Sequence, residues 1–283
     1  MVKMKIFNGF NVPQNYYNSI ILIGNFDGVH LGHQKLFKKA REYKKKFKCK
    51  IGVITFNPMP KMFFNKNLKH FKLMNQSQKI NQFKKQKVDF LINQKFTKSF
   101  SKIKAEFFIK NYLYKKIKAK VLFVSNNFRF GNKREGDTRL LKFYEKKYNY
   151  KLIIPPPLKK NNKIISSTEI RKLLSNGNLI KANKYLTRKW EIEGKVEKGR
   201  QVGGKIGFAT CNIDIGNYII AKPGVYSVKV KLFSNKKRIN GIANLGFRPT
   251  FNQKKILLEV NLFNFNRNIY NKKIAVEFIK FIR

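Results

Sequence analysis

The chain has 283 residues, 42% of them hydrophobic, and a formal net charge of +49 from 63 basic and 14 acidic side chains. This length and apolar content exclude wholesale disorder and favour two folded domains. The N-terminus lacks a signal-peptide pattern, and no apolar run approaches the roughly 20 residues of a membrane span. Cys49 and Cys211 form no metal, redox or disulfide spacing, so we expect a cytoplasmic protein.

Strands and helices alternate in the first half of the chain. Short apolar runs predict strands at Ile20–Ile23, Ile51–Phe56, Val88–Ile92, Val121–Ser125 and Leu152–Ile154. Helical spacing predicts helices from Gly32, around Glu106–Tyr114 and over Leu140–Tyr148. This order predicts an α/β domain with a Rossmann-like, mostly parallel sheet and helices on both faces.

The pattern changes after the three prolines at 155–157. One helix is expected to begin with Ser167 or Thr168 as its N-cap and to stop at Gly177. A second helix is expected over Leu179–Leu186. From Trp190 onward, short β-rich pieces separated by glycines predict a small antiparallel β-barrel. We therefore expect two domains, 1–186 and 187–283.

The positive charge has two interpretations. A high positive charge is typical of nucleic-acid-binding proteins, which usually make bidentate contacts through arginine. Here only 11 of the 63 basic residues are arginine, and the lysines are spread along the chain beside many Asn, Ile and Phe. A bias toward A/T-rich codons accounts for this composition without any partner.

The first strand leads into the sequence GNFDGVHLGH, which places His30 and His33 just after a buried run. A strand, a glycine turn and a helix start present backbone N–H groups and a positive dipole end to an anion. Both imidazoles can donate to phosphate oxygens there as charge develops during nucleotidyl transfer. The alternatives are ordinary histidines or a metal pair, although no third ligand is evident nearby.

A second motif, IISSTEIR at Ile164–Arg171, places three hydroxyls and an arginine at a helix start. Such a group can grip a phosphate chain, but alone it can equally be a capping box with a surface arginine. The two motifs together resemble the adenylyltransferase and aminoacyl-tRNA synthetase superfamily, whose members carry an H-x-G-H of this kind.

Further stretches narrow the resemblance. TFNPMP (Thr55–Pro60) and NNFRFGNKREGD (Asn126–Asp137) make the chain similar to the bacterial bifunctional riboflavin kinase/FAD synthetase family. The similarity continues through EGKVEKGRQVGGKIGFATCNI (Glu193–Ile213), GVYSVKV, ANLGFRPTF and LLEVNLFNFN, in the family's order. It implies ATP-dependent phosphorylation of riboflavin to FMN, adenylylation of FMN to FAD, and Mg²⁺ as cofactor.

The resemblance also implies roles for individual residues. In the adenylyl-transfer site, ATP would be bound by Gly24, Asn25, Phe26, Asp27, Gly28, Ser166, Ser167 and Thr168. His30 and His33 would hold its phosphates during catalysis, and Arg171 would grip the pyrophosphate. The flavin would be bordered by Phe56, Asn127, Phe128 and Arg129. In the kinase site, Gly194 and Gly199 would bind ATP, Thr210 and Asn212 would bind Mg²⁺, and Glu259 would be the catalytic base.

For Glu259 the residues leave an alternative open, because a carboxylate between Leu258 and Val260 can also be an outward-facing partner of a lysine. The family pattern is also broken in places. Asn127 replaces an aspartate, Met59 a histidine, Gly204 an arginine and Ala209 a proline, and the family usually continues with a helix beyond Arg283.

Two alternatives to the bifunctional enzyme follow from these departures and from the charge. One is a monofunctional FMN adenylyltransferase with a degenerate barrel. The other is a nucleic-acid-binding protein, although no lysine-rich synthetase loop or anticodon-reading region is found. We expect small-molecule substrates only, with no specific nucleic acid and no membrane, and the sequence leaves the oligomeric state open.

Overall fold

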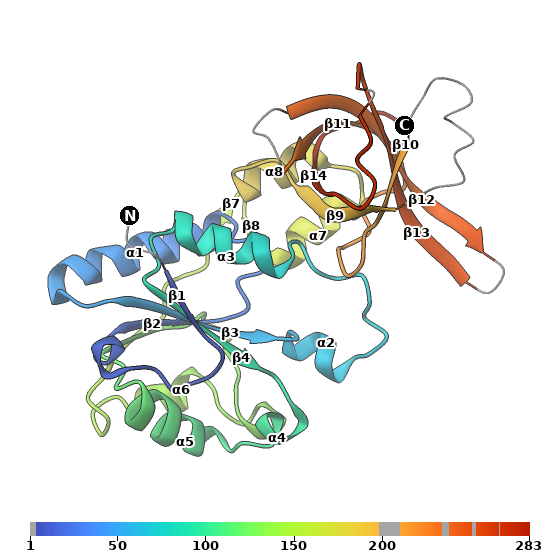
Figure 1. Cartoon of the computed structure of the whole chain (residues 1–283). Helices are drawn as coiled ribbons and strands as arrows, with labels where there is room; N and C mark the ends of the chain where they lie inside the picture. The colour runs from blue at the N-terminus through green and yellow to red at the C-terminus, as the bar shows by residue number, and fades with distance from the viewer. Residues whose placement is uncertain (1–3, 198–209, 234–237, 251–252, 266) are drawn as a thin grey trace. The chain divides into compact units, whose positions relative to one another are not determined.

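The computed structural model describes residues 4–197, 210–233, 238–250, 253–265 and 267–283 (Figure 1). The chain forms two compact units. The sheet unit comprises the residues up to Leu68 and Ser77–Ile165. The barrel unit comprises Ser166–Arg283 together with Lys69–Gln76, a segment that we call the strap. In the parts that the structure describes, no helix has the length and apolarity that a bilayer crossing requires.

Six parallel strands form the centre of the sheet unit. They are β1 (Lys5–Phe7), β2 (Ile20–Ile23), β3 (Ile51–Asn57), β4 (Phe90–Lys95), β5 (Val121–Phe123) and β6 (Lys151–Ile153). Their order is β1-β4-β3-β2-β5-β6, and every neighbouring pair is parallel. The chain leaves β2 toward β3 and later returns to its other side with β5, so the strand order reverses beside β2. In open α/β sheets, ligands bind outside the carboxyl ends of the strands at such a reversal.

Helices cover both faces of this sheet (Figure 1). The α-helices are α1 (Leu31–Phe47), α2 (Pro60–Phe64), α3 (Gln76–Lys85), α4 (Lys98–Ser101), α5 (Ala105–Phe107) and α6 (Thr138–Phe143). Two 3₁₀ turns, η1 (Gln14–Tyr16) and η3 (Asn132–Arg134), a π-helix η2 (Phe108–Lys116) and a small hairpin of β7 (Lys159–Lys160) and β8 (Lys163–Ile164) complete the unit. Helices α1 and α3 lie on one face of the sheet, and α4, α5 and α6 lie on the other.

The structure confirms the predicted parallel sheet. The strand at Ile20–Ile23 is placed as predicted, and the helix expected from Gly32 begins at Leu31. The stretch around Glu106–Tyr114 is helical, but most of it is a π-helix, a form that is rare and frequent at functional sites. Strand β1 and helix α3 were not predicted.

A closed antiparallel barrel forms most of the barrel unit, as predicted. Its strands, in order around the barrel, are β10 (Thr210–Asp214), β13 (Gln253–Leu262), β12 (Arg238–Thr250), β11 (Gly224–Leu232), β14 (Lys273–Phe281) and β9 (Glu191–Glu197). Two helices precede the barrel, α7 (Ser167–Ser175) and α8 (Leu179–Leu186).

Backbone groups of the strap bond to the rest of the barrel unit. The amides of Phe71 and Lys72 donate to the carbonyl of Asn217 at 3.0 and 2.8 Å. The indole N–H of the buried Trp190 donates to the carbonyl of Leu73 at 2.9 Å. These bonds satisfy polar groups that would be costly to bury unpaired, and the strap buries Leu73 and Met74.

The sequence placed a domain boundary near residue 187, whereas the compact units divide between Ile165 and Ser166. The two divisions differ because α8 packs on the barrel. The side chain of Asn183 donates to the carbonyl of Phe278 at 3.2 Å and accepts from the amide of Trp190 at 2.7 Å.

Candidate functional site

The segment between β2 and α1 turns sharply at the strand-order reversal. The amide of Gly24 still pairs with the carbonyl of Ile54 at 3.1 Å, which continues the sheet by one residue. Phe26, Gly28 and Val29 then adopt positive φ angles of 47°, 86° and 37°. Such a backbone is unfavourable for residues with a Cβ and is typical of functional turns. The turn delivers His30 as the N-cap residue of α1.

The two histidines stack on each other at the start of α1. Their ring centroids lie 3.7 Å apart with an interplanar angle of 24°. A Cβ on Gly32 would lie 3.1 Å from the His30 ring and 3.2 Å from the carbonyl oxygen of Ile165. This crowding explains why glycine stands between the histidines. Phe26 is buried beneath them, with its ring edge-on to His33 at 5.2 Å, so it supports the pair from the core.

His33 is held in its neutral form. Burial lowers its pKa well below 6.5, and the neighbouring charges of His30 and Lys79 lower it further. In the part of the chain that the structure describes, Nδ1 of His33 has no hydrogen-bond partner. A neutral imidazole has one N–H donor, so His33 can donate to a phosphate oxygen without being charged. Lys79, on α3, is a buried cation of this region that the sequence analysis missed.

The IISSTEIR motif begins α7 in the barrel unit. The N-cap is Ser166, whose Oγ accepts from the amide of Glu169 at 3.2 Å, so the prediction of Ser167 or Thr168 was wrong by one or two residues. Arg171 is not a free surface arginine. Its Nε–H donates to the carbonyl of Phe71 at 2.7 Å, and its Cζ lies 3.6 Å from the centroid of the Phe71 ring.

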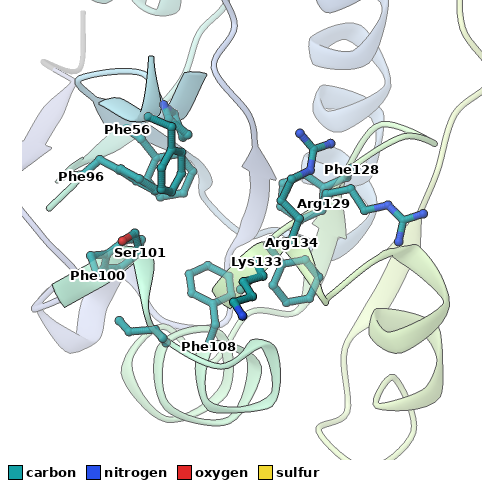
Figure 2. Close-up of a pocket in the computed structure, with 14 residues that line it drawn as sticks. Phe56, Phe96, Phe100, Ser101, Phe108, Phe128, Arg129, Lys133 and Arg134 are labelled. Atoms are coloured by element: carbon teal, nitrogen blue, oxygen red, sulfur yellow. The ribbon is translucent and has the colours of Figure 1, made fainter. Parts of the chain in front are cut away.

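A cavity of about 310 Å³ lies in the sheet unit, lined by residues of β3, α4, η2 and the loop after β5 (Figure 2). It is lined by seven phenylalanines: Phe56, Phe64, Phe96, Phe100, Phe108, Phe128 and Phe130. Its volume is at the low end of the range for small-molecule pockets, which are mostly apolar with a few placed polar groups. The predicted residues Phe56, Phe128 and Arg129 line it.

Asn127, predicted beside the flavin, is not among the residues that line the cavity. It is exposed, and its Oδ1 accepts from the hydroxyl of Ser125 at 2.9 Å. Lys133 and Arg134 line the cavity and were not predicted.

In the barrel, Asn212 and Glu259 are direct cross-strand neighbours on β10 and β13, so their side chains share one face. Asn212 is only 5% exposed, and its Oδ1 accepts no hydrogen bond in the described residues. A buried oxygen without a protein partner is suited to a ligand, and amide and carboxylate oxygens suit Mg²⁺. The described residues hold no cluster of three or more His, Cys, Asp or Glu side chains that could bind a metal.

Several predicted kinase residues lie outside this description. Gly199, Gly204 and Ala209 are not among the described residues, and of Thr210 only the backbone is described. Gly194 lies in β9, where a Cβ would approach Cγ2 of Ile213 to 2.2 Å, so close strand packing also requires a glycine there.

Comparison with known proteins assigns both halves of the chain. A family model described as FAD synthetase matches residues 12–169, and one described as riboflavin kinase matches residues 186–283. The bifunctional riboflavin kinase/FMN adenylyltransferase of Buchnera aphidicola subsp. Schizaphis graminum is 42% identical, over 99% of this chain and 91% of its own length. The protein of the same name from Escherichia coli K12 is 32% identical, over 99% of this chain and 90% of its own. This chain belongs to the bifunctional riboflavin kinase/FMN adenylyltransferase family.

A solved structure extends the similarity to the fold. A crystal structure described as a macrolide-efflux protein from Streptococcus pneumoniae matches with a TM-score of 0.86 and 28% identity, covering 100% of this chain and 91% of that one. The FAD synthetase part of this family member holds the histidine pair and the aromatic cavity, and the riboflavin kinase part holds Asn212 and Glu259.

Sequence reasoning missed the residues that complete these sites from distant segments. Phe96 and Phe100 belong to the run KFTKSFSKI, whose spaced phenylalanines were the available signal. For Lys79 and Phe71 no local signal exists, because each acts on a residue that is far away in the chain.

Proposed function

We propose that this chain phosphorylates riboflavin to FMN in its barrel and adenylylates FMN to FAD in its sheet unit, using ATP for both steps. The observation that carries the proposal is the presence of both family models, in order, along almost the whole chain. The riboflavin kinase match favours two activities over a monofunctional adenylyltransferase. Neither match favours a nucleic-acid-binding protein.

Adenylyl transfer is assigned to the turn between β2 and α1. A phosphate oxygen of FMN attacks the α-phosphorus of ATP, and the bond from that phosphorus to the pyrophosphate oxygen breaks. His30 and His33 would donate hydrogen bonds to phosphate oxygens whose charge grows in the transition state. The backbone from Gly24 to Gly28 would surround ATP, with the start of α1 adding its positive dipole end. Ser166, Ser167, Thr168 and Arg171 would bind the departing pyrophosphate.

The aromatic cavity is assigned to the flavin ring of FMN. The isoalloxazine system is planar and largely apolar, so phenylalanine side chains such as Phe56 and Phe128 bury it and stack against it. This placement keeps the ring fixed while the phosphate at the other end of FMN reacts.

Riboflavin phosphorylation is assigned to the face of Asn212 and Glu259. Glu259 would take the proton from the riboflavin 5′-hydroxyl as its oxygen attacks the γ-phosphorus of ATP and the bond to ADP breaks. Asn212 and Thr210 would hold Mg²⁺, which neutralises phosphate charge when bound. The Oδ1 of Asn212 is buried and has no hydrogen-bond partner in the described part of the chain, which supports this ligand role. We further propose a cytoplasmic enzyme with small-molecule partners only.

The division of labour is tested by product analysis with two variants. Riboflavin and Mg-ATP given to the unmodified chain should yield FMN and then FAD. His33→Ala should abolish FAD formation and leave FMN formation intact, and Glu259→Gln should do the reverse. A chain that makes FAD from FMN but nothing from riboflavin would instead be the monofunctional enzyme.

A further inference from the structure

Three cations stand at one side of the aromatic cavity, next to Phe128 (Figure 2). They are Arg129, Lys133 and Arg134. Phenylalanine walls suit a planar aromatic ring, and cations gathered at one side suit an anionic end, so the lining fits a ligand that has both. FMN and riboflavin share the ring and differ only in the phosphate on the ribityl chain.

The loop that carries two of these cations is fixed by hydrogen bonds within it and to neighbouring residues. Phe130 and Gly136 pair in both directions, at 3.0 and 2.9 Å, which closes the loop at its base. The amide of Asn132 donates to the carbonyl of Ile103 at 2.7 Å, and a carboxylate oxygen of Glu135 accepts from the amide of Ala105 at 2.6 Å. The loop is therefore held in one conformation from three directions.

That conformation is unfavourable for the residues that occupy it. Lys133 and Arg134 have φ angles of 48° and 62°, two consecutive left-handed residues that are not glycine. Left-handed backbone is disfavoured by the Cβ atom and persists where surrounding contacts over-determine it, often at ligand-binding sites. Here it presents two long cationic side chains to the same cavity.

The charges of the three cations are not equivalent. The Arg129 guanidinium lies 3.1 Å from the carboxylate of Asp137, which also caps α6 by accepting from the amides of Arg139 and Leu140. Among the residues that the structure describes, Lys133 and Arg134 take part in no ion pair. Their charge is thus available to a ligand, while Arg129 shares the carboxylate of Asp137 with Arg139, whose Nε also lies 3.1 Å from it.

We propose that Lys133 and Arg134 bind the phosphate of FMN and make the adenylyl-transfer site select the phosphorylated flavin over riboflavin. The inference rests on the proposed function and deepens it. Because the adenylyl-transfer site binds the phosphate that the kinase step adds, unphosphorylated riboflavin binds this site weakly and does not block FAD formation.

The test removes both charges without disturbing the left-handed backbone. Asparagine tolerates positive φ, so the double variant Lys133→Asn, Arg134→Asn keeps the loop. Lys48 and Lys87 are exposed lysines with φ angles of 49° and 59° that do not line the cavity. The matched control, Lys48→Asn with Lys87→Asn, therefore removes the same charge from the same kind of backbone.

Two constants are measured in the full chain: the KM for FMN in FAD formation, and the inhibition constant of lumiflavin against FMN. Lumiflavin carries the ring without the ribityl chain, so it reports ring binding and cannot be phosphorylated. Loss of two charge-assisted contacts is expected to raise the KM for FMN by about tenfold or more. The lumiflavin constant should stay within about twofold, and the control should match the unmodified chain.

An unchanged KM for FMN in the double variant overturns the proposal. An equal rise in the KM for FMN and in the lumiflavin inhibition constant also overturns it, because the loop would then shape the ring pocket and not bind the phosphate. Riboflavin phosphorylation and the melting temperature of each variant show that it is folded. The single variant Lys133→Arg keeps the positive charge and should keep the KM of the unmodified chain. If the unmodified chain forms no FAD from FMN, the proposed function itself has failed. None of the other outcomes contradicts the proposed function.

Discussion

The stacking of Arg171 on Phe71 offers a sharp test of how the pyrophosphate group is held. The Arg171 Cζ lies 3.6 Å from the centroid of the Phe71 ring, and its Nε–H donates to the Phe71 carbonyl. That carbonyl is a backbone group, so it is present whatever side chain stands at position 71. The substitution Phe71→Leu therefore removes the ring face and keeps the hydrogen bond and most of the apolar bulk.

The expected size of the effect follows from the contact. A cation over an aromatic ring contributes about 0.5–2 kcal/mol. If this energy aligns Arg171 with the leaving pyrophosphate, its loss lowers kcat/KM for FAD formation about 2- to 30-fold. Phe71→Tyr keeps the ring and should retain the unmodified rate.

The assay follows FAD formation from FMN and Mg-ATP by chromatography, with FMN formation from riboflavin measured on the same preparation. Phe143→Leu is the matched control, since Phe143 is 75% exposed and belongs to the sheet unit. An unmodified rate of FAD formation in Phe71→Leu would refute the reasoning. An equal fall in FMN formation would do the same, because it would show a general loss of structure.

Three further predictions concern buried polar groups. The pKa of His33 is lowered below 6.5 in the folded chain, so below about pH 6.5 the unfolded chain takes up a proton that the folded chain does not. The free energy of unfolding should therefore fall with decreasing pH, by at most about 1.4 kcal/mol per pH unit. Urea unfolding at pH 7.5 and 5.5 should show a smaller fall in His33→Gln than in the unmodified chain. Asn212→Leu removes a buried acceptor that has no partner among the described residues, so it should not lower the melting temperature. The Mg²⁺ concentration needed for riboflavin phosphorylation should rise about tenfold or more, and an unchanged requirement would exclude Asn212 as a ligand. The fully buried hydroxyl of Thr55 has no partner among the described residues. Thr55→Val should therefore raise the free energy of unfolding by about 1 kcal/mol. A destabilised variant would mean that the hydroxyl has a hydrogen-bond partner.

The parts of the fold that sequence patterns predicted are those with strong local apolar periodicity. The strand Ile20–Ile23 and the helix Leu179–Leu186 match the structure at both ends. Helix α3 was missed because most of its buried residues, including Gln78 and Lys79, are polar. Its burial depends on what it packs against in three dimensions, and no local pattern records that.

The same distinction separates the predicted from the unpredicted parts of the site. His30 and His33 could be placed from sequence because the strand, turn and helix that hold them are consecutive in the chain. The partners of Arg171 could not, because Phe71 lies a hundred residues earlier. The resemblance places Asn127 at the flavin, and this stays a prediction: its side chain is exposed and accepts from Ser125, and it does not line the cavity.

The strap has a consequence for anyone who divides this protein. The barrel unit is discontinuous in the sequence, so no single cut releases it whole. A fragment that starts at residue 187 would lack the Leu73 carbonyl that the buried indole of Trp190 requires, and also the Asn183 side chain that bonds to Phe278. Such a fragment should be unstable because of the missing pieces and not because of any fault in the kinase barrel. A usable kinase fragment would have to carry Lys69–Gln76 grafted ahead of α7, or be supplied with that peptide in trans.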